Sequence, residues 1–459
     1  MKNIVIFFLS LFFLNSCTST KNWHSTQTDI KWQADFDELT GKEHLFFKKQ
    51  PNRLVYLSSQ LKYTLGELSL KDGREILADN LTITHKKIKL DHNRKLNITG
   101  NKARGSFILE YPVYAIKQVN VNFNKNIELL ALCYFFTIYE DIVAIPETQT
   151  IEIDGKQVKV KDLYSLNIKI ANEFIPYLKS KNLSIIRSYF EKDFYLHYSN
   201  FLLSIDSFPH AFVTSDTQFV KRFETIDDAK IFVKAMNDFY TEINFDQFLD
   251  KYKLYYNTMI TEVTKNLPAE NFITEMEHFY GKRIQNYNLY PSLTMPFSQG
   301  FAVGSSDMIG NIFGSFNIPK EIDNNSNPDL GFKNNVALRT LCVHEFGHSF
   351  INPVIDQIDD KHIKATEKLF EPIKEKMFAQ GYNEWKICLY EHFVRAGEIV
   401  IAKLLGDDNK AQEIMNDNVT NRSFIYLPQI AEKLEYWYYN EFFTKTYPQK
   451  VDEIISELN

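Results

Sequence analysis

The segment from His344 to His348 constrains the fold of this chain more than any other feature, because it reads His-Glu-Phe-Gly-His, an instance of H-E-x-x-H. On an α-helix, residues i and i+4 lie on one face, so the two imidazoles can converge on one cation. Glu345 lies roughly 100° around the same helix, where its carboxylate can reach a water molecule beside that cation. The pattern predicts a helix of about Asn335 to Ile351 that carries two metal ligands and a general base.

The sequence of this helix also predicts where it ends and how closely it packs. Asn352-Pro353 is expected to end it, because proline disfavours α geometry in the residue before it. Gly347 costs a helix roughly 1 kcal/mol relative to alanine, which favours close packing against a neighbouring element. The alternative for the whole segment is a helix whose histidines are only hydrogen-bonded within the protein.

A catalytic zinc site needs a third protein ligand besides the two histidines. Ile351 and Val354 stand where the metzincin extension requires Gly and His, which excludes that subclass. A second helix is expected from Asn383 to Leu405, closed by Gly406. On it, Glu391 and Arg395 are four residues apart, which suits a ligand carboxylate oriented by a guanidinium, although spacing alone favours an ordinary i,i+4 ion pair.

Three other side chains compete with Glu391 as the third ligand. Glu398 lies on the same helix face but about 10 Å further along the axis, so both carboxylates could not bind one ion. Cys388 would make a softer site than hydrolytic zinc usually has. His362 follows Pro353 closely enough to fold back. Spacing therefore leaves the third ligand open.

Two blocks of the sequence, His344 to Pro353 and Glu391 to Ala396, resemble an uncharacterised family of bacterial lipoproteins. This family is described as zinc peptidases and is known mainly as a domain of unknown function. More broadly, H-E-x-x-H followed 43 residues later by Glu391 resembles the glutamate zincins, or gluzincins. The resemblance covers about Asn126 to the C-terminus.

The resemblance implies Zn²⁺ held by His344, His348 and Glu391, with Arg395 beside the last. It implies peptide-bond hydrolysis by metal-bound water with Glu345 as general base, and a sheet whose edge strand aligns a peptide.

Further roles follow from that implication. Met308 to Phe316 is the candidate edge strand, with an ordinary core strand as the alternative. His392 or Tyr426 is the candidate for stabilising the oxyanion.

The first residues indicate a lipoprotein signal. Lys2 precedes an apolar run from Ile4 to Leu14, which is too short to cross a bilayer. The run ends in Leu-Asn-Ser-Cys, which resembles a bacterial lipobox whose Cys17 becomes the lipidated first residue of the mature chain. A plain secretory signal is the alternative. Because no acidic residue follows up to His24, a lipid anchor at the periplasmic face of the outer membrane is preferred to the cell surface.

The remaining chain has two parts with different patterns. Apolar residues alternate between about Trp32 and Asn122, with turn signals between them, which predicts short antiparallel strands. From Ile127 on, helical patterns dominate, interrupted by a β-like stretch from Tyr287 to Phe316. We expect an α+β protein with a signal peptide (1–16), a β-rich region (17–125) and a largely helical zincin-like metallopeptidase domain with a small sheet (126–459).

Charge and cysteine content narrow the function classes. A net charge of -6 lacks the basic excess that phosphate binding needs, so nucleic acid is not an expected partner. Cys133, Cys342 and Cys388 form an odd set, so a disulfide framework is not expected, and the apolar runs around Cys133 and Cys342 favour burial as small hydrophobes. We expect a zinc metallopeptidase, a hydrolase of the cell envelope, whose partners are a peptide or protein substrate and the membrane. The alternatives are a catalytically inactive binding or scaffold lipoprotein and a zinc hydrolase acting on a cell-wall component.

Overall fold

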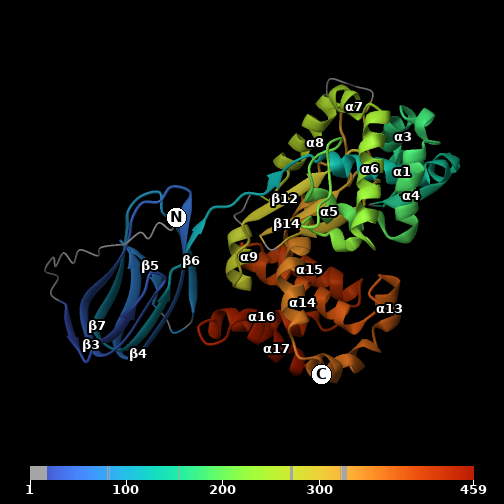
Figure 1. Ribbon diagram of the computed structural model, residues 1–459. Helices are drawn as coiled ribbons and strands as arrows, with labels where there is room; N and C mark the ends of the chain where they lie inside the picture. Colours follow the sequence, from blue (N-terminus) through green and yellow to red (C-terminus); the bar gives the residue numbers. More distant parts are fainter. Residues whose placement is uncertain are drawn as a thin grey trace. The chain divides into compact units, whose positions relative to one another are not determined.

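The computed structural model describes residues 18–458 except residues 80, 82, 154, 269–271, 306, 321 and 323–327. The predicted signal peptide (1–16) and Cys17 lie outside the described residues. The chain divides into two compact units (Figure 1): Met1–Lys117 with Glu432–Lys450, and Gln118–Ala431 with Val451–Asn459. The boundary lies slightly before the expected one, and the first unit includes a C-terminal segment that no sequence pattern indicated.

Three long antiparallel strands build the first unit: β3 (Lys31–Phe47), β4 (Arg53–Asp72) and β7 (Arg94–Glu110). Strand β7 lies between the other two. Shorter strands pair with β3 and β4, namely β1 (Ser19–Lys21) and β2 (His24–Gln27) with β3, and β5 (Glu75–Ala78), β6 (Thr84–Lys89) and β8 (Val113–Ala115) with β4. The β-rich N-terminal region is therefore confirmed, with longer strands than predicted.

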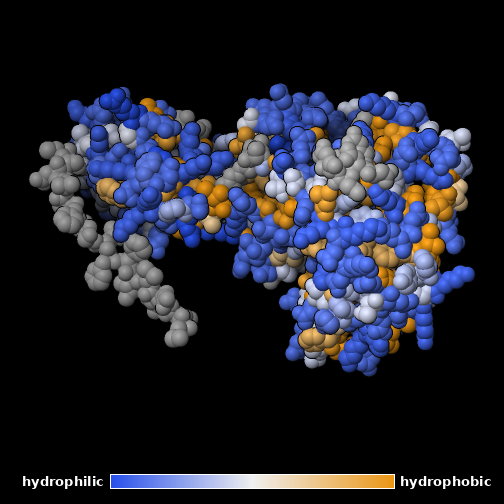
Figure 2. All heavy atoms as spheres, turned by 90° about the horizontal axis from the view of Figure 1, so that it is seen from above, coloured by the Kyte–Doolittle hydropathy of each residue, from blue (hydrophilic) through white to orange (hydrophobic). Residues whose placement is uncertain are grey.

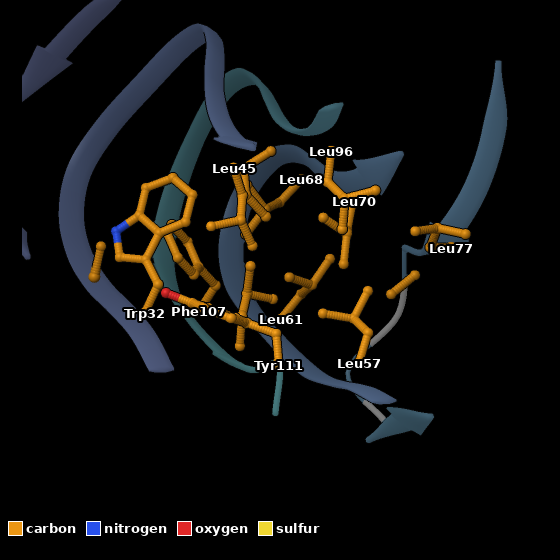
Figure 3. Packing of buried hydrophobic residues seen from close by; sticks show 14 of the residues in the cluster. Trp32, Leu45, Leu57, Leu61, Leu68, Leu70, Leu77, Leu96, Phe107 and Tyr111 are labelled. Atoms are coloured by element: carbon orange, nitrogen blue, oxygen red, sulfur yellow. The ribbon is translucent and has the colours of Figure 1, made fainter. Parts of the chain in front are cut away.

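The first unit's sheet is bent around its own apolar core. Register shifts interrupt the pairing of β7 with both neighbours. At one of them Gly66 has φ +70°, and a Cβ there would lie 2.3 Å from the carbonyl oxygen of Lys102, so only glycine fits. Such bulges bend a sheet, which lets Trp32, Leu61 and Leu70 pack inside it (Figure 3).

The C-terminal part of helix α16 (Leu427–Asn440) packs on the first unit's sheet through a buried histidine. His85 of β6 donates from Nε2 to the carbonyl oxygen of Tyr438 at 3.0 Å, and its Nδ1 accepts from the Ser58 hydroxyl at 2.8 Å. Its ring stacks on Tyr438 with centroids 4.0 Å apart. Burial lowers the pKa of His85 to about 4, so a neutral imidazole joins two strands to the helix.

The second unit is mostly helical, as predicted. Its first half contains α1 (Lys125–Ala144), α3 (Ser165–Asn172), α4 (Lys181–Lys192), α5 (Ser199–Leu203), α6 (Ile226–Glu242), α7 (Phe245–Lys251), α8 (Lys253–Lys265) and α9 (Phe272–Tyr280). Its second half contains α12 (Asp360–Thr366), α13 (Lys374–Ala379), α14 (Trp385–Leu404) and α15 (Asp408–Thr420). Helix α17 (Tyr447–Ser456) begins in the first unit and continues into the second at Val451. Polar side chains cover much of the visible surface, with apolar patches between them (Figure 2). In the described part of the chain, no helix combines the length and apolar character needed to cross a membrane.

A small sheet lies among these helices, with strand order β13 (Gly300–Gly304), β14 (Met308–Phe313), β12 (Asn286–Pro291) and β9 (Asn120–Val121). Strand β14 pairs with β12 in parallel and with β13 antiparallel. The prediction that Met308 to Phe316 forms the edge strand is therefore wrong. Nearly every β14 side chain is buried, as in a central strand, and Gly310 lets the backbone of Asn288 approach closely.

The helix with the H-E-x-x-H motif has three parts: α10 (Asn335–Thr340), one π-helical turn (Leu341–Glu345) and α11 (Phe346–Asp356). The helix is thus present, but its predicted end at Asn352-Pro353 is wrong. Pro353 has no N–H for the carbonyl of Ser349, and the ammonium of Lys282 donates to that carbonyl at 3.4 Å instead. A neighbouring donor therefore lets the helix continue through proline.

Candidate metal centre

Three side chains from two helices converge in the second unit. One potential ligand atom each from His344, His348 and Glu391 lies within 4.8 Å of the others. The Nε2 atom of His344 is 3.6 Å from Oε2 of Glu391, and Nε2 of His348 is 3.3 Å from Oε1. The two histidines come from the π turn and from α11, and the carboxylate comes from α14.

Close helix packing brings these side chains together. A Cβ on Gly347 would lie 3.3 Å from Cγ1 of Val394, so glycine lets α11 and α14 approach. The expectation that Gly347 marks close packing is confirmed. The π turn adds a residue to one helical turn and carries His344, and the side chain of Asn311 in β14 donates to the Leu341 carbonyl at 3.0 Å.

Two of the distances between the potential ligand atoms are those that a zinc ion requires. A tetrahedral zinc ion with bonds of about 2.1 Å has ligand atoms about 3.4 Å apart. The two distances of 3.3 and 3.6 Å between imidazole nitrogens and carboxylate oxygens agree with this spacing. Two imidazoles and one carboxylate are also the donor set of one class of catalytic zinc site.

Each imidazole has a partner that orients its outer nitrogen. The Nδ1 atom of His344 lies 2.9 Å from Oε2 of Glu398, and Nδ1 of His348 lies 3.2 Å from Oδ1 of Asn352. Both partners accept hydrogen bonds, so each Nδ1 carries a proton and each Nε2 faces the cluster, where it can bind a metal ion in its deprotonated form. Arg395 lies 3.2 Å from Nδ1 of His344, but two donors form no hydrogen bond.

Charges around Glu391 keep its carboxylate ionised. Burial by itself would raise the pKa of Glu391, but the hydrogen bond from His348 and the charge of Arg395 lower it to about 2, with smaller contributions from the charges of both histidines. Arg395 lies 2.9 Å from Oε2 of Glu391 and stacks on Phe424. A carboxylate has to be deprotonated to bind a metal ion, and Glu391 is deprotonated at neutral pH.

The other candidate ligands lie elsewhere or have another role. His362 pairs with Asp452 at 2.6 Å. Cys388 is buried, and burial followed by the nearby Glu391 raises the pKa of its thiol to about 12. Glu398 contacts the far side of the His344 ring. Among the side chains that spacing left open, Glu391 is the one that meets both histidines.

A cleft of about 520 Å³ opens onto the cluster. Its walls are formed by α10 with the π turn, by α14 and by α15. Glu345 lines this cleft together with the three cluster residues, and α15 contributes charged side chains such as Lys410, Glu413 and Asp417. Among the described residues that line the cleft, none belongs to β13 or β14.

The structure does not bring His392 or Tyr426 to this cleft. His392 is fully buried, donates from Nδ1 to the Cys388 carbonyl at 2.8 Å, and has a pKa lowered by burial to about 4. The Tyr426 hydroxyl donates to the Leu369 carbonyl at 2.8 Å.

Tyr382 lines the cleft instead, and its hydroxyl accepts from the guanidinium of Arg395 at 3.2 Å. The pKa of Tyr382 is raised by burial and then by the charge of Glu391. Sequence reasoning missed this residue, and its one local signal is its position in the loop just before the helix of Glu391.

Comparison with protein families finds a match over residues 214–454 to a family described as a domain of unknown function, DUF4932. The matched segment spans more than half of the 459 residues and includes the whole candidate metal centre. No curated protein and no solved structure matches the chain.

Proposed function

This chain belongs to the DUF4932 family, and we propose that it is a zinc-dependent metallopeptidase of the glutamate zincin type. The observation that carries this proposal is the convergence of His344, His348 and Glu391 beside a cleft that Glu345 also lines. The ionised carboxylate of Glu391 and the two Nε2 atoms meet in one cluster and can hold the ion once both imidazoles are neutral. Zinc bound there would supply a Lewis acid that polarises the scissile carbonyl and lowers the pKa of water.

The chain's own residues divide the remaining work. Glu345 accepts a proton from the attacking water and passes it to the leaving amine. Glu398 and Asn352 hold the two imidazoles in their ligand orientation, and Arg395 holds Glu391.

Tyr382 is the candidate for stabilising the oxyanion, in place of His392 and Tyr426. Its hydroxyl lies in the cleft wall, and it can donate its proton to a developing oxyanion while accepting a hydrogen bond from Arg395. The positive charge of Arg395 also favours the negative charge of an oxyanion bound to the Tyr382 hydroxyl.

The secondary structure of the cleft walls limits how a peptide substrate could bind. The described lining residues lie mostly on helices, so side chains and not a strand edge would hold a bound peptide. A cell-wall peptide cross-link, which does not need an extended strand partner, is therefore a second candidate substrate. The presence of Glu345 in the cleft wall argues against an inactive scaffold.

We also propose that the mature chain begins at Cys17 and is held by lipid at the periplasmic face of the outer membrane. The support is the lipobox-like Leu14 to Cys17 after a short apolar run.

The direct test is to purify the mature chain, measure its zinc content, and screen it against a peptide library and against cell-wall fragments. We expect one zinc per chain and a hydrolytic activity that a chelator removes and added zinc restores. Less than stoichiometric zinc after reloading would overturn the proposal. Activity confined to wall fragments would select the second substrate.

A further inference from the structure

Tyr280, the last residue of α9, is enclosed between the two helices that carry the candidate ligands. Its side chain is 4% exposed, and its ring stacks on Phe350 of α11 with centroids 4.8 Å apart. Its hydroxyl faces a glycine on each helix. A Cβ on Gly397 of α14 would lie 2.2 Å from the hydroxyl oxygen, and one on Gly347 of α11 would lie 3.5 Å from it.

Both glycines adjoin residues of the metal centre. Gly347 directly precedes His348, and Gly397 directly precedes Glu398, which orients His344. Glycine is less favourable than alanine inside a helix, so each of these positions calls for a packing reason. Two such positions that face one phenol hydroxyl indicate that the space between the helices is shaped for this ring.

We infer that Tyr280 is a positioning residue whose ring sets the separation of α11 and α14 at the metal centre, with Gly347 and Gly397 accommodating its hydroxyl. This inference rests on the proposed function, because it concerns the geometry of the proposed zinc site. It assigns no contact between Tyr280 and the ion or the substrate.

The ring is suited to act as a spacer because it is rigid and closely surrounded. A phenol is rigid beyond χ2, and this one is buried, stacked on Phe350 and held in a close-packed interior. Burial, and after it the charge of Glu398, raises the pKa of Tyr280 well above its usual range, so the hydroxyl stays neutral.

The zinc geometry is sensitive to this separation. Glu391 comes from α14, whereas His348 comes from α11 and His344 from the turn before it, so a change in helix separation alters both nitrogen–oxygen distances directly. Disturbing groups that only orient metal ligands typically costs 10-fold to 100-fold in metal affinity.

The test measures zinc affinity by chelator competition in four variants: Gly397→Ala, Tyr280→Phe, the double variant Gly397→Ala/Tyr280→Phe, and the control Tyr240→Phe. Gly397→Ala should lose about 10-fold or more in affinity, because its methyl collides with the hydroxyl. The double variant should bind zinc at least about threefold more tightly than Gly397→Ala, because the collision with the hydroxyl is gone and the nearest ring carbons, 3.2 and 3.5 Å from the new Cβ, need to shift by only a few tenths of an ångström. Tyr280→Phe alone should also stay within about threefold.

The control separates positioning from general stability. Tyr240 is a buried tyrosine in α6 whose hydroxyl donates to Asp246, so Tyr240→Phe should lower the unfolding midpoint without changing zinc affinity. The visible absorption of the Co²⁺-loaded variants adds a readout of ligand geometry. It should change in Gly397→Ala and return in the double variant.

Wild-type affinity in Gly397→Ala, or a double variant that binds zinc no better than Gly397→Ala, would overturn the inference. Should Gly397→Ala not fold, the double variant still has to fold and bind zinc, and its failure to do so counts against the spacer. Absence of stoichiometric zinc in the wild-type chain would overturn the proposed function instead. The wild type therefore tests the proposed function, and the variants test the role of Tyr280.

Discussion

The carboxylate of Glu398 lies 2.9 Å from Nδ1 of His344, on the side of the imidazole opposite the candidate metal centre. Glu391 lies seven residues earlier on the same face of α14 and approaches the other nitrogen of that ring at 3.6 Å. Two turns of helix place the two residues about 10 Å apart along the axis, so the Glu391 carboxylate can serve as a ligand while the Glu398 carboxylate orients His344. Glu398, which spacing left open as the third ligand, therefore orients His344 instead.

Replacing Glu345 with glutamine should abolish hydrolysis and leave zinc bound, because Glu345 acts on water and is not one of the three ligands. We expect a loss of at least 10²-fold in kcat/KM with one zinc per chain retained. Assays with paired metal analysis check this. A Glu345→Gln enzyme of normal activity would refute the assigned base.

Glu391 should be the side chain whose loss removes zinc. Glu391→Gln is the informative variant, because the glutamine amide oxygen can still accept a hydrogen bond from the buried Arg395, whereas Glu391→Ala removes that acceptor and destabilises the fold. Glu398→Ala should weaken zinc binding by 10-fold to 100-fold without abolishing it, while His362→Ala and Cys388→Ser should leave it unchanged. Full zinc binding in Glu391→Gln, with loss in one of the others, would show that the ligand is misassigned.

Tyr382→Phe should lower kcat by about 10²-fold with little change in KM or zinc content, as expected for one lost oxyanion donor. Tyr426→Phe is the matched control, since Tyr426 donates to the Leu369 carbonyl and does not line the cleft. Steady-state kinetics of both variants test this. Equal losses in the two would remove the basis for choosing Tyr382.

Acid should destabilise the first unit through His85. The pKa of His85 is lowered by burial from 6.5 to about 4, so the folded state favours the neutral ring. Its contribution is fully present above pH 6.5 and is lost as the pH falls toward 4, which amounts to roughly 3 kcal/mol. The unfolding midpoint measured between pH 7.5 and 4 should fall less steeply in His85→Gln than in the wild type. Parallel curves would contradict this account.

Cys17→Ser should release the chain from the membrane fraction or leave it unprocessed. The residue lies outside the described part of the structure, so this prediction comes from the lipobox-like sequence. Stable anchoring needs two lipid signals or their equivalent, so the unmodified chain should not stay on membranes. Fractionation and the mass of the mature N-terminus decide the question. Unchanged processing and membrane association would exclude lipidation at this cysteine.

Local sequence patterns determined the main secondary structure of this protein and the placement of its two histidines. The i,i+4 spacing of His344 and His348 puts both imidazoles on one helical face in any fold that keeps the helix. Gly347 signalled close packing, alternating apolar residues signalled the N-terminal sheet, and helical periodicity signalled the second unit. Each of these depends on neighbours within a few turns of chain.

Tertiary structure decided the rest, because the remaining choices depend on which distant segments pack together. Glu391 and Glu398 have similar helical surroundings, and only the packing of α14 against α11 assigns one to each side of His344. The π turn, the helix that continues through Pro353 and the central place of β14 rest on contacts from other elements. The position of the Tyr382 hydroxyl in the cleft likewise rests on a hydrogen bond from Arg395, which lies 13 residues later in the chain. Spacing along a chain specifies which side chains share a face, whereas only packing specifies what that face meets.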